Sequence, residues 1–202
     1  VSQAHWHRGL RVNAAVGVDE VDKQQYEAAL TQNLNSLHER LKAMRWRHQP
    51  IRRVQIPKEK GKSRPIGIST TEDKIVQEAL REVLTVIYEP FFRPCSHGFR
   101  PGRSAHDALR ALDGAMVRGG GKKWILEADI QSFFDSIDRK KLMEMLQERV
   151  RDGAFLRLIG KCLHVGILEG AEYSEPDTGT VQGSVLSPIL GNVFLHHVLD
   201  LW

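Results

Sequence analysis

The stretch from residue 124 to residue 138 reads WILEADIQSFFDSID and combines an apolar run with several carboxylates. The run from Trp124 to Ile130 has the β-favouring, apolar character of a short buried strand. Asp129 falls near its end, where a rigid strand can present a catalytic group. Carboxylate oxygens are ligands that Mg²⁺ prefers, and phosphoryl transfer uses such ions beside the nucleotide phosphates. Asp129 is therefore a candidate metal ligand, although a turn or helix-capping aspartate is the commoner meaning of such a residue.

Carboxylates further along the same stretch favour the capping interpretation more strongly. Asp135 and Asp138 lie where the strand is expected to give way to a helix that begins at about residue 139. Aspartates at such positions accept hydrogen bonds from the first amides of the helix. We therefore expect Asp135 and Asp138 to point away from a metal site.

Patterns of both helix and strand follow along the chain, which predicts a mixed α and β fold. Apolar residues recur every three or four positions from Tyr26 to Met44, as in one amphipathic helix. Residues 53–57 and 64–68 read as two strands of a hairpin, joined by a basic turn. Further helices are expected from Thr70 to before Pro90, from Ser104 with a buried face at Ala108, Leu109 and Leu112, and over about 139–151 and 154–165. A last helix is expected through Leu190 to Leu199.

Charge is distributed unevenly over the 202 residues, although the formal net charge is only +4. Residues 1–110 carry 19 Lys and Arg against 12 Asp and Glu, whereas residues 111–202 carry 10 against 13. Ten basic residues and one acid lie between positions 40 and 64. Such density favours a polyanion partner, and a solvated basic face is the alternative. Trp6 and Trp46 near these charges add a weaker indication of base stacking.

Membrane and metal signatures are weak in the sequence. No apolar run approaches the roughly 18 residues of a membrane span, and the first residues lack the apolar core of a signal peptide. Cys95 and Cys162 are far apart and form no zinc-binding pattern. We therefore expect a cytoplasmic protein with no membrane partner, in a reducing compartment.

A second constellation lies at residues 179–183, which read GTVQG and precede an apolar helix. The Gln182 amide could position a nucleotide, and Gly183 would let the backbone approach it closely. Taken alone, the pattern is more often an ordinary junction between a loop and a helix.

Four blocks of sequence, in this order, resemble the reverse transcriptases of group II introns, often called maturases. They are RRVQIPK (52–58) with GKSRPIGI (61–68), SHGFRPGRSA (96–105), ADIQSFFD (128–135) and VQGSVLSP (181–188). The similarity runs from about Gly17 to Trp202. The block at 96–105 favours the group II branch over the retroviral enzymes.

The resemblance implies an α+β fold of the right-hand polymerase, reverse-transcriptase type. Residues 1–121 would form the fingers region, with a basic β-hairpin and helices, and residues 122–202 a partial palm. Asp129 would be the first catalytic metal ligand, and Ile130 would offer its backbone carbonyl to a second Mg²⁺ ion.

Further residues acquire roles through the same resemblance. Lys58 and Arg64 would hold the triphosphate of a bound dNTP, and Gln182 would touch the nucleotide near its sugar. Phe134 would be the steric gate that excludes a ribose 2′-hydroxyl. The residues expected to contact nucleic acid are Arg52, Arg53, Lys60, Lys62, Arg100 and Arg103, the last two with a structural role as an equal alternative; His97 is expected to be structural.

One departure from the family pattern affects the chemistry. The family continues with a Tyr-Ala-Asp-Asp turn that supplies the remaining catalytic carboxylate, and this sequence reaches Trp202 without it. Asp200 is expected on the preceding helix and cannot replace it. We therefore expect an incomplete two-metal Mg²⁺ site and no activity from the chain by itself.

Two functions follow as hypotheses. The first is a fragment of an RNA-directed DNA polymerase that extends a DNA primer on an RNA template from dNTPs. The alternative is a non-catalytic module that binds structured intron RNA and assists splicing. Asp129, Phe134 and Gln182 favour the polymerase, whereas the missing aspartate motif favours the alternative; CRISPR-linked and diversity-generating relatives are also compatible.

Overall fold

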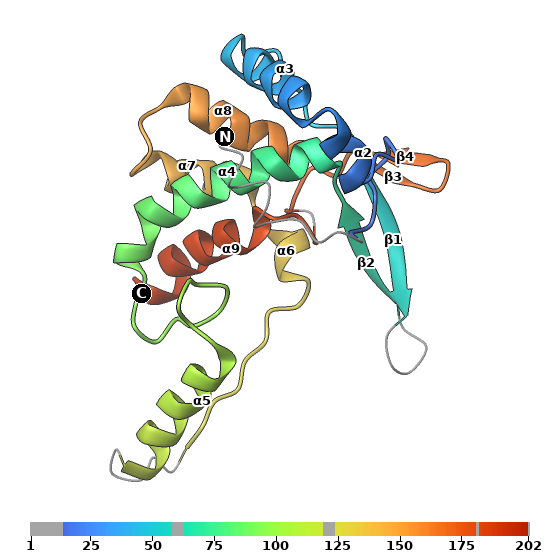
Figure 1. Cartoon of the computed structure of the whole chain (residues 1–202). Helices are drawn as coiled ribbons and strands as arrows, with labels where there is room; N and C mark the ends of the chain where they lie inside the picture. The colour runs from blue at the N-terminus through green and yellow to red at the C-terminus, as the bar shows by residue number, and fades with distance from the viewer. Residues whose placement is uncertain (1–13, 58–62, 119–123, 181, 202) are drawn as a thin grey trace.

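The computed structural model describes residues 14–57, 63–118, 124–180 and 182–201, in which two pairs of short strands lie between runs of helices (Figure 1). The first part contains α2 (Lys23–Ala28), α3 (Leu30–Lys42), β1 (Ile51–Pro57), β2 (Ser63–Ile68), α4 (Thr71–Tyr88) and a 3₁₀ turn (Glu89–Phe91). Then follow α5 (Ala105–Asp113), a π-helical turn (Gly114–Arg118), α6 (Phe133–Ser136), α7 (Arg139–Gln147), α8 (Gly153–Leu163), β3 (Ile167–Glu169), β4 (Glu172–Ser174), α9 (Ser187–Leu195) and a second π-helical turn (His196–Asp200). The predicted mixed fold is confirmed.

Four strands form one sheet in the order β2-β1-β3-β4. The expected hairpin is present, because β1 and β2 pair antiparallel with Arg52 opposite Ile68. β1 also pairs in parallel with β3, with Ile51 opposite Ile167, which joins segments more than a hundred residues apart. The hairpin is thus attached to the second half of the chain by backbone hydrogen bonds as well as by side chains.

The hydrophobic core lies among four helices, in which α9 packs against both α4 and α7, and α7 packs against α8 (Figure 1). Its buried side chains belong to one cluster that includes Leu84 and Tyr88 from α4, Leu142 from α7, Ile159 from α8 and Val193 from α9. Residues before and after position 121 therefore share a core.

Local capping explains where two of the predicted helices begin. Thr70 accepts a hydrogen bond from the Asp73 amide at the start of α4, and Ser104 and Asp107 form a capping box at the start of α5. The predicted helix over 26–44 is instead divided in two, because Ala29 leaves helical geometry (φ −125°, ψ 34°). None of the helices in the described ranges is both long and apolar enough to cross a membrane.

The expected burial of Leu109 and Leu112 and the stacking role suggested for Trp46 are wrong. Leu109 and Leu112 are 61% and 50% exposed, because α5 extends away from the body of the molecule (Figure 1). Trp46 is fully buried in the core, so its ring is not available for base stacking. Trp6 lies outside the described residues.

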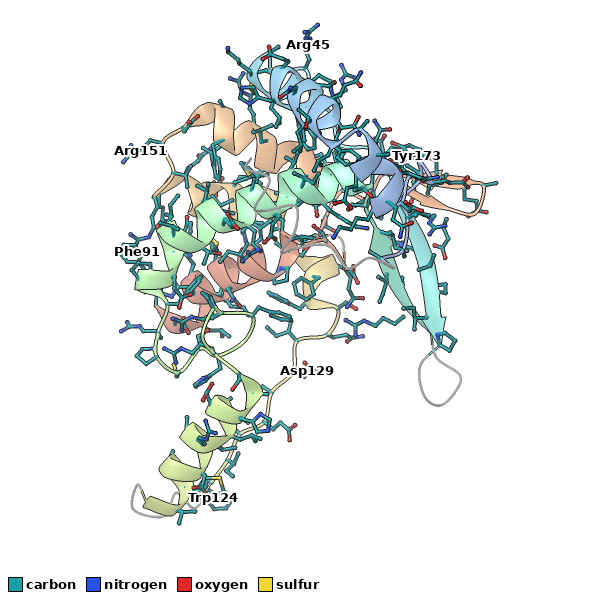
Figure 2. The ribbon with its side chains drawn as sticks, viewed as in Figure 1. Arg45, Phe91, Trp124, Asp129, Arg151 and Tyr173 are labelled. Carbon is teal, nitrogen blue, oxygen red and sulfur yellow. The ribbon has the colours of Figure 1, made fainter. Side chains whose placement is uncertain are left out.

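The strand predicted over Trp124–Ile130 does not form. These residues run as an extended segment beside α5, and Trp124 and Leu126 are more than 90% exposed (Figure 2). A strand needs a neighbour to satisfy its backbone amides and carbonyls, and no described segment pairs with this one. An apolar, β-favouring sequence is therefore not enough to make a strand here.

Candidate active site

Helix α6 is held by a loop that comes from far along the chain, residues 178–180 and 182–185, which we call the Gln182 loop. The Thr180 amide donates to the Phe134 carbonyl at 2.6 Å, and the Gly179 amide donates to the Ile137 carbonyl at 2.8 Å. The Thr178 hydroxyl adds a hydrogen bond to the Asp135 carbonyl at 3.2 Å. These contacts unite the two constellations that the sequence separates by about fifty positions.

The same loop also docks on the β-hairpin. The Gly67 amide of β2 donates to the Gln182 carbonyl at 2.8 Å. Gly183 has φ +101°, and a Cβ atom there would lie 2.6 Å from the Gly67 carbonyl oxygen. Glycine is therefore required at position 183 by both its backbone angle and the closeness of β2.

Arg64 and Gln182 meet at this junction. With the Gln182 amide oriented so that its oxygen faces Arg64, that oxygen accepts from the guanidinium Nε at 3.2 Å and Nη2 at 2.9 Å. The amide nitrogen then donates to the Pro65 carbonyl at 3.1 Å. Two residues expected at a nucleotide therefore lie side by side, and the remaining donors of the Arg64 guanidinium have no other partner among the described residues.

Phe134 is fixed by its surroundings on α6. Its ring lies 5.2 Å from the Phe133 ring, measured between centroids, and both rings rest on α9 at Gly191. A Cβ atom at Gly191 would lie 3.1 and 3.2 Å from the two rings. A larger residue at position 191 would therefore push the two rings away from α9. The half-buried ring is thus held in place on the same helix that the Gln182 loop grips.

Two residues that hold the Gln182 loop in place, Arg139 and Gln77, were not predicted from the sequence. Arg139 is buried, and its guanidinium donates to the carbonyls of Pro176, Thr178 and Gly179 at 2.7 to 3.1 Å. Burial lowers the pKa of Arg139, while Asp177 opposes this shift. Because its sequence position is the first turn of an amphipathic helix, nothing in the sequence distinguishes it from an exposed arginine.

Gln77 of α4 fixes the other end of the Gln182 loop. Its buried amide oxygen accepts from the Ser184 hydroxyl and the Val185 amide, both at 3.1 Å. Its nitrogen donates to the Ser69 hydroxyl at 3.1 Å. A polar residue on the apolar stripe of a predicted helix is the only signal that the sequence offered for this role.

Asp129 and Ile130 lie on the exposed segment that precedes α6 (Figure 2). Asp129 makes no hydrogen bond or ion pair with the described part of the chain, so its carboxylate is available to a cation. Asp138 caps α7 by accepting from the Lys141 amide at 3.0 Å, as expected. Ser132, between the two, has left-handed backbone geometry (φ 49°), which turns the chain into α6.

The other basic residues fall into distinct environments. Arg100 is buried, with its guanidinium on Glu89 at 2.8 Å and on the carbonyls of Arg93 and Ser96 at 2.7 Å. That geometry supports the structural alternative for Arg100, because all three of its guanidinium nitrogens donate to groups of the protein. Arg103 is half-buried and donates to the Pro94 carbonyl at 2.8 Å.

Two of the residues expected to contact nucleic acid, Arg52 and Arg53, are half-buried arginines on β1. Arg53 lies 3.8 Å from Glu169 of β3, and the Nε of Arg52 is shielded without a hydrogen-bond partner among the described residues. Lys58, Lys60 and Lys62 lie outside the described residues, so their expected roles stay predictions.

The donors on the Asp129 segment suit a hard cation. Asp129 offers an unpaired carboxylate and Ile130 a neighbouring carbonyl, and both are oxygen ligands. The described residues contain no group of three or more His, Cys, Asp or Glu side chains placed around one point. The segment therefore fits part of a magnesium ligand set.

The hairpin and the Gln182 loop bring the Arg64 guanidinium and the Gln182 amide together, and backbone hydrogen bonds join the loop to α6, the helix that carries Phe134. The family model described as reverse transcriptase (RNA-dependent DNA polymerase) matches residues 56–202. The chain belongs to this family, and its relatives place it in the group II intron branch.

Relatives support that placement over most of the chain. The group II intron-encoded protein LtrA of Lactococcus lactis is 44% identical over 151 residues, which are 74% of this chain and 25% of LtrA. An uncharacterized 91 kDa protein in the cob intron of Schizosaccharomyces pombe is 43% identical over 165 residues, 82% of this chain and 20% of that protein. The chain thus spans a quarter or less of the length of these relatives.

A solved structure gives the same fold. A chain of a partial Cas6-RT-Cas1–Cas2 complex superposes with a TM-score of 0.63 and 26% identity, covering 98% of this chain and 32% of the other. The expected reverse-transcriptase fold is therefore confirmed.

Proposed function

We propose that this chain is the nucleotide-selecting part of a group II intron reverse transcriptase, which extends a DNA primer on an RNA template from dNTPs. The observation that carries the proposal is the junction of Arg64 and Gln182, which is tied through the Gln182 loop to the helix that holds Phe134. The Arg64 guanidinium can bind a triphosphate, and the Gln182 amide can hydrogen-bond a sugar. The Phe134 ring, held in one position, can exclude a 2′-hydroxyl.

The proposed division of labour follows from these positions. Arg64, with Lys58, orients the triphosphate, and Gln182 contacts the nucleotide at the sugar. The Phe134 ring limits the space beside that sugar. Asp129 and the Ile130 carbonyl would hold Mg²⁺, which neutralises charge on the phosphates when bound. Structured intron RNA is the further partner we propose, because the relatives are intron-encoded.

Primer extension in a longer protein that contains this chain tests the proposal. Phe134→Val should raise kcat/KM for ribonucleotides relative to deoxynucleotides, since the smaller side chain leaves room for the hydroxyl. Phe133→Val, which changes the neighbouring ring, is the matched control and should move this ratio much less. An unchanged ratio for Phe134→Val would place the gate elsewhere.

The metal-binding role needs its own variant. Asp129→Ala should reduce extension by orders of magnitude, whereas Asp138→Ala should act on stability through the lost helix cap. We also expect no extension from the 202-residue chain alone. Extension that survives Asp129→Ala would contradict the metal-binding role of Asp129. No extension by the longer protein itself, with intron splicing lost when Arg64 and the hairpin lysines are replaced, would favour the splicing-only alternative.

A further inference from the structure

A second candidate binding site lies far from Asp129, in an open hollow of about 1160 Å³ between the end of α3, α7 and α8. Figure 2 shows Arg45, which lines the hollow, at the top of the molecule and Asp129 well below it. Its lining includes Met44, Arg45, Arg47, Met143, Arg157 and Lys161. The lining includes four Lys or Arg side chains and no acid.

The backbone before β1 directs two of these charges outward. The Arg45 and Trp46 amides both donate to the Arg40 carbonyl, at 2.8 and 3.1 Å, which fixes this segment against the end of α3. Trp46 is fully buried, and Arg45 and Arg47 on either side of it are exposed. The Lys161 ammonium donates to the carbonyls of Met44 and Trp46 at 3.1 and 2.6 Å, which fastens this segment to α8.

The charges that remain are not neutralised within the protein. Arg45, Arg47 and Arg157 are exposed and make no ion pair in the part of the chain that the structure describes. Elsewhere the chain does pair its arginines, as at Arg40 with Glu72 and Arg81 with Glu78. Three unpaired guanidinium groups around one hollow create a positive potential that favours an anion.

The floor of the hollow is shaped by small and apolar residues. Gly153 and Gly160 lie seven residues apart on the same face of α8, and a Cβ atom at either would meet open space. Close packing therefore does not require these glycines, and their absent side chains leave the hollow open. Met44, Met143 and Leu156 give it apolar surface. A cationic rim above an apolar floor matches a nucleotide, which has an anionic phosphate and an apolar base face.

We propose that this hollow binds a single-stranded segment of RNA, with phosphates on Arg45, Arg47 and Arg157 and a base against the methionines. The choice of RNA rests on the proposed function, because intron-encoded reverse transcriptases act with RNA. The site itself is separate from the polymerase site. It would let the protein hold one RNA segment while another is copied.

Fluorescence anisotropy with a labelled oligouridylate and the 202-residue chain tests the proposal. The triple variant R45A/R47A/R157A should weaken binding by about tenfold or more and reduce the salt slope by about two, as expected for three phosphates of a single strand. The matched control R93A/R110A/K141A removes the same charge elsewhere and should change the affinity by less than about twofold. Equal losses in the two variants would overturn the proposal.

A variant that fills the hollow distinguishes binding inside it from binding to basic residues spread over the surface. Gly160→Leu keeps the charge and suits a helix, but it places a side chain in the hollow. It should weaken oligouridylate binding while the salt slope stays the same, and unchanged affinity would contradict binding inside the hollow. Competition by polyglutamate as effective as that by RNA would show that the partner is an acidic protein and overturn the assignment.

Failure of this site is distinguishable from failure of the polymerase proposal. In the longer protein, the triple variant should lose oligouridylate binding yet keep the preference for deoxynucleotides over ribonucleotides. Phe134→Val should do the reverse. Loss of the nucleotide preference in the triple variant would show that the hollow belongs to the polymerase site and contradict the proposal.

Discussion

The Gln182 loop and the Trp124–Ile130 segment differ in a way that the sequence alone does not suggest. The loop has the pattern of an ordinary junction, yet β2, α4, α6 and Arg139 all hold it by hydrogen bonds. The segment has the pattern of a buried strand, yet it is exposed and unpaired among the described residues. Partners supplied by the rest of the fold, more than local pattern, decide which segment becomes rigid.

The largest expected effect concerns the buried arginine behind the loop. Arg139→Ala should lower the free energy of unfolding by about 3 kcal/mol, because three carbonyls lose a charged donor inside the protein. Urea unfolding of the chain measures the change. Lys141→Ala, on an exposed position of the same helix, is the control and should cost less than about 0.5 kcal/mol. A loss for Arg139→Ala no larger than the control would mean that the loop is held mainly by its backbone contacts.

A smaller effect is expected where the loop meets β2. Gly183→Ala should cost about 2 kcal/mol, because the methyl group adds a clash with the Gly67 carbonyl to the strain of a positive φ. Gly170→Ala is the matched control, since Gly170 has φ +61° but open space around its Cβ position. The difference between the two unfolding free energies isolates the clash. Equal costs would contradict the close docking of loop and hairpin.

The smallest effect is expected in the exposed segment. Leu126→Ser should change the free energy of unfolding by less than about 0.5 kcal/mol, because the side chain is 93% exposed. Leu142→Ser, at a fully buried position, should cost about 3 kcal/mol or more. A cost at Leu126 that approaches the cost at Leu142 would show that the segment is packed in solution.

Features set by neighbouring residues could be predicted from the sequence. The limits of α4 follow from Thr70 and Pro90, the start of α5 from Ser104, and the hairpin from two β-favouring runs around a basic turn. The contact between Arg64 and Gln182 was not accessible from local pattern, because it depends on a loop returning to a strand more than a hundred residues earlier. The resemblance to group II intron reverse transcriptases implied their shared role without giving that geometry.

Features set by distant partners were missed or mistaken for the same reason. Trp46 lies in a basic stretch but is fully buried in the core, and Arg100 in a basic block turns inward to Glu89. The helix predicted over 26–44 is broken at Ala29, where no proline or glycine in the sequence indicates a break. Arg139 and Gln77 became visible as positioning residues only when the loop they hold was placed.

Amide hydrogen exchange tests the contrast between the two regions most directly. The amides of Gly67, Gly179 and Thr180 donate within the frame and should exchange about a hundredfold or more slowly than those of residues 124–130. Peptide-resolved mass spectrometry of the 202-residue chain gives both rates in one experiment. Strong protection of the loop with rapid exchange in the segment is the predicted result. Similar exchange in the two regions would contradict the account, in which hydrogen bonds hold the Gln182 loop in place while residues 124–130 lack such partners among the described residues.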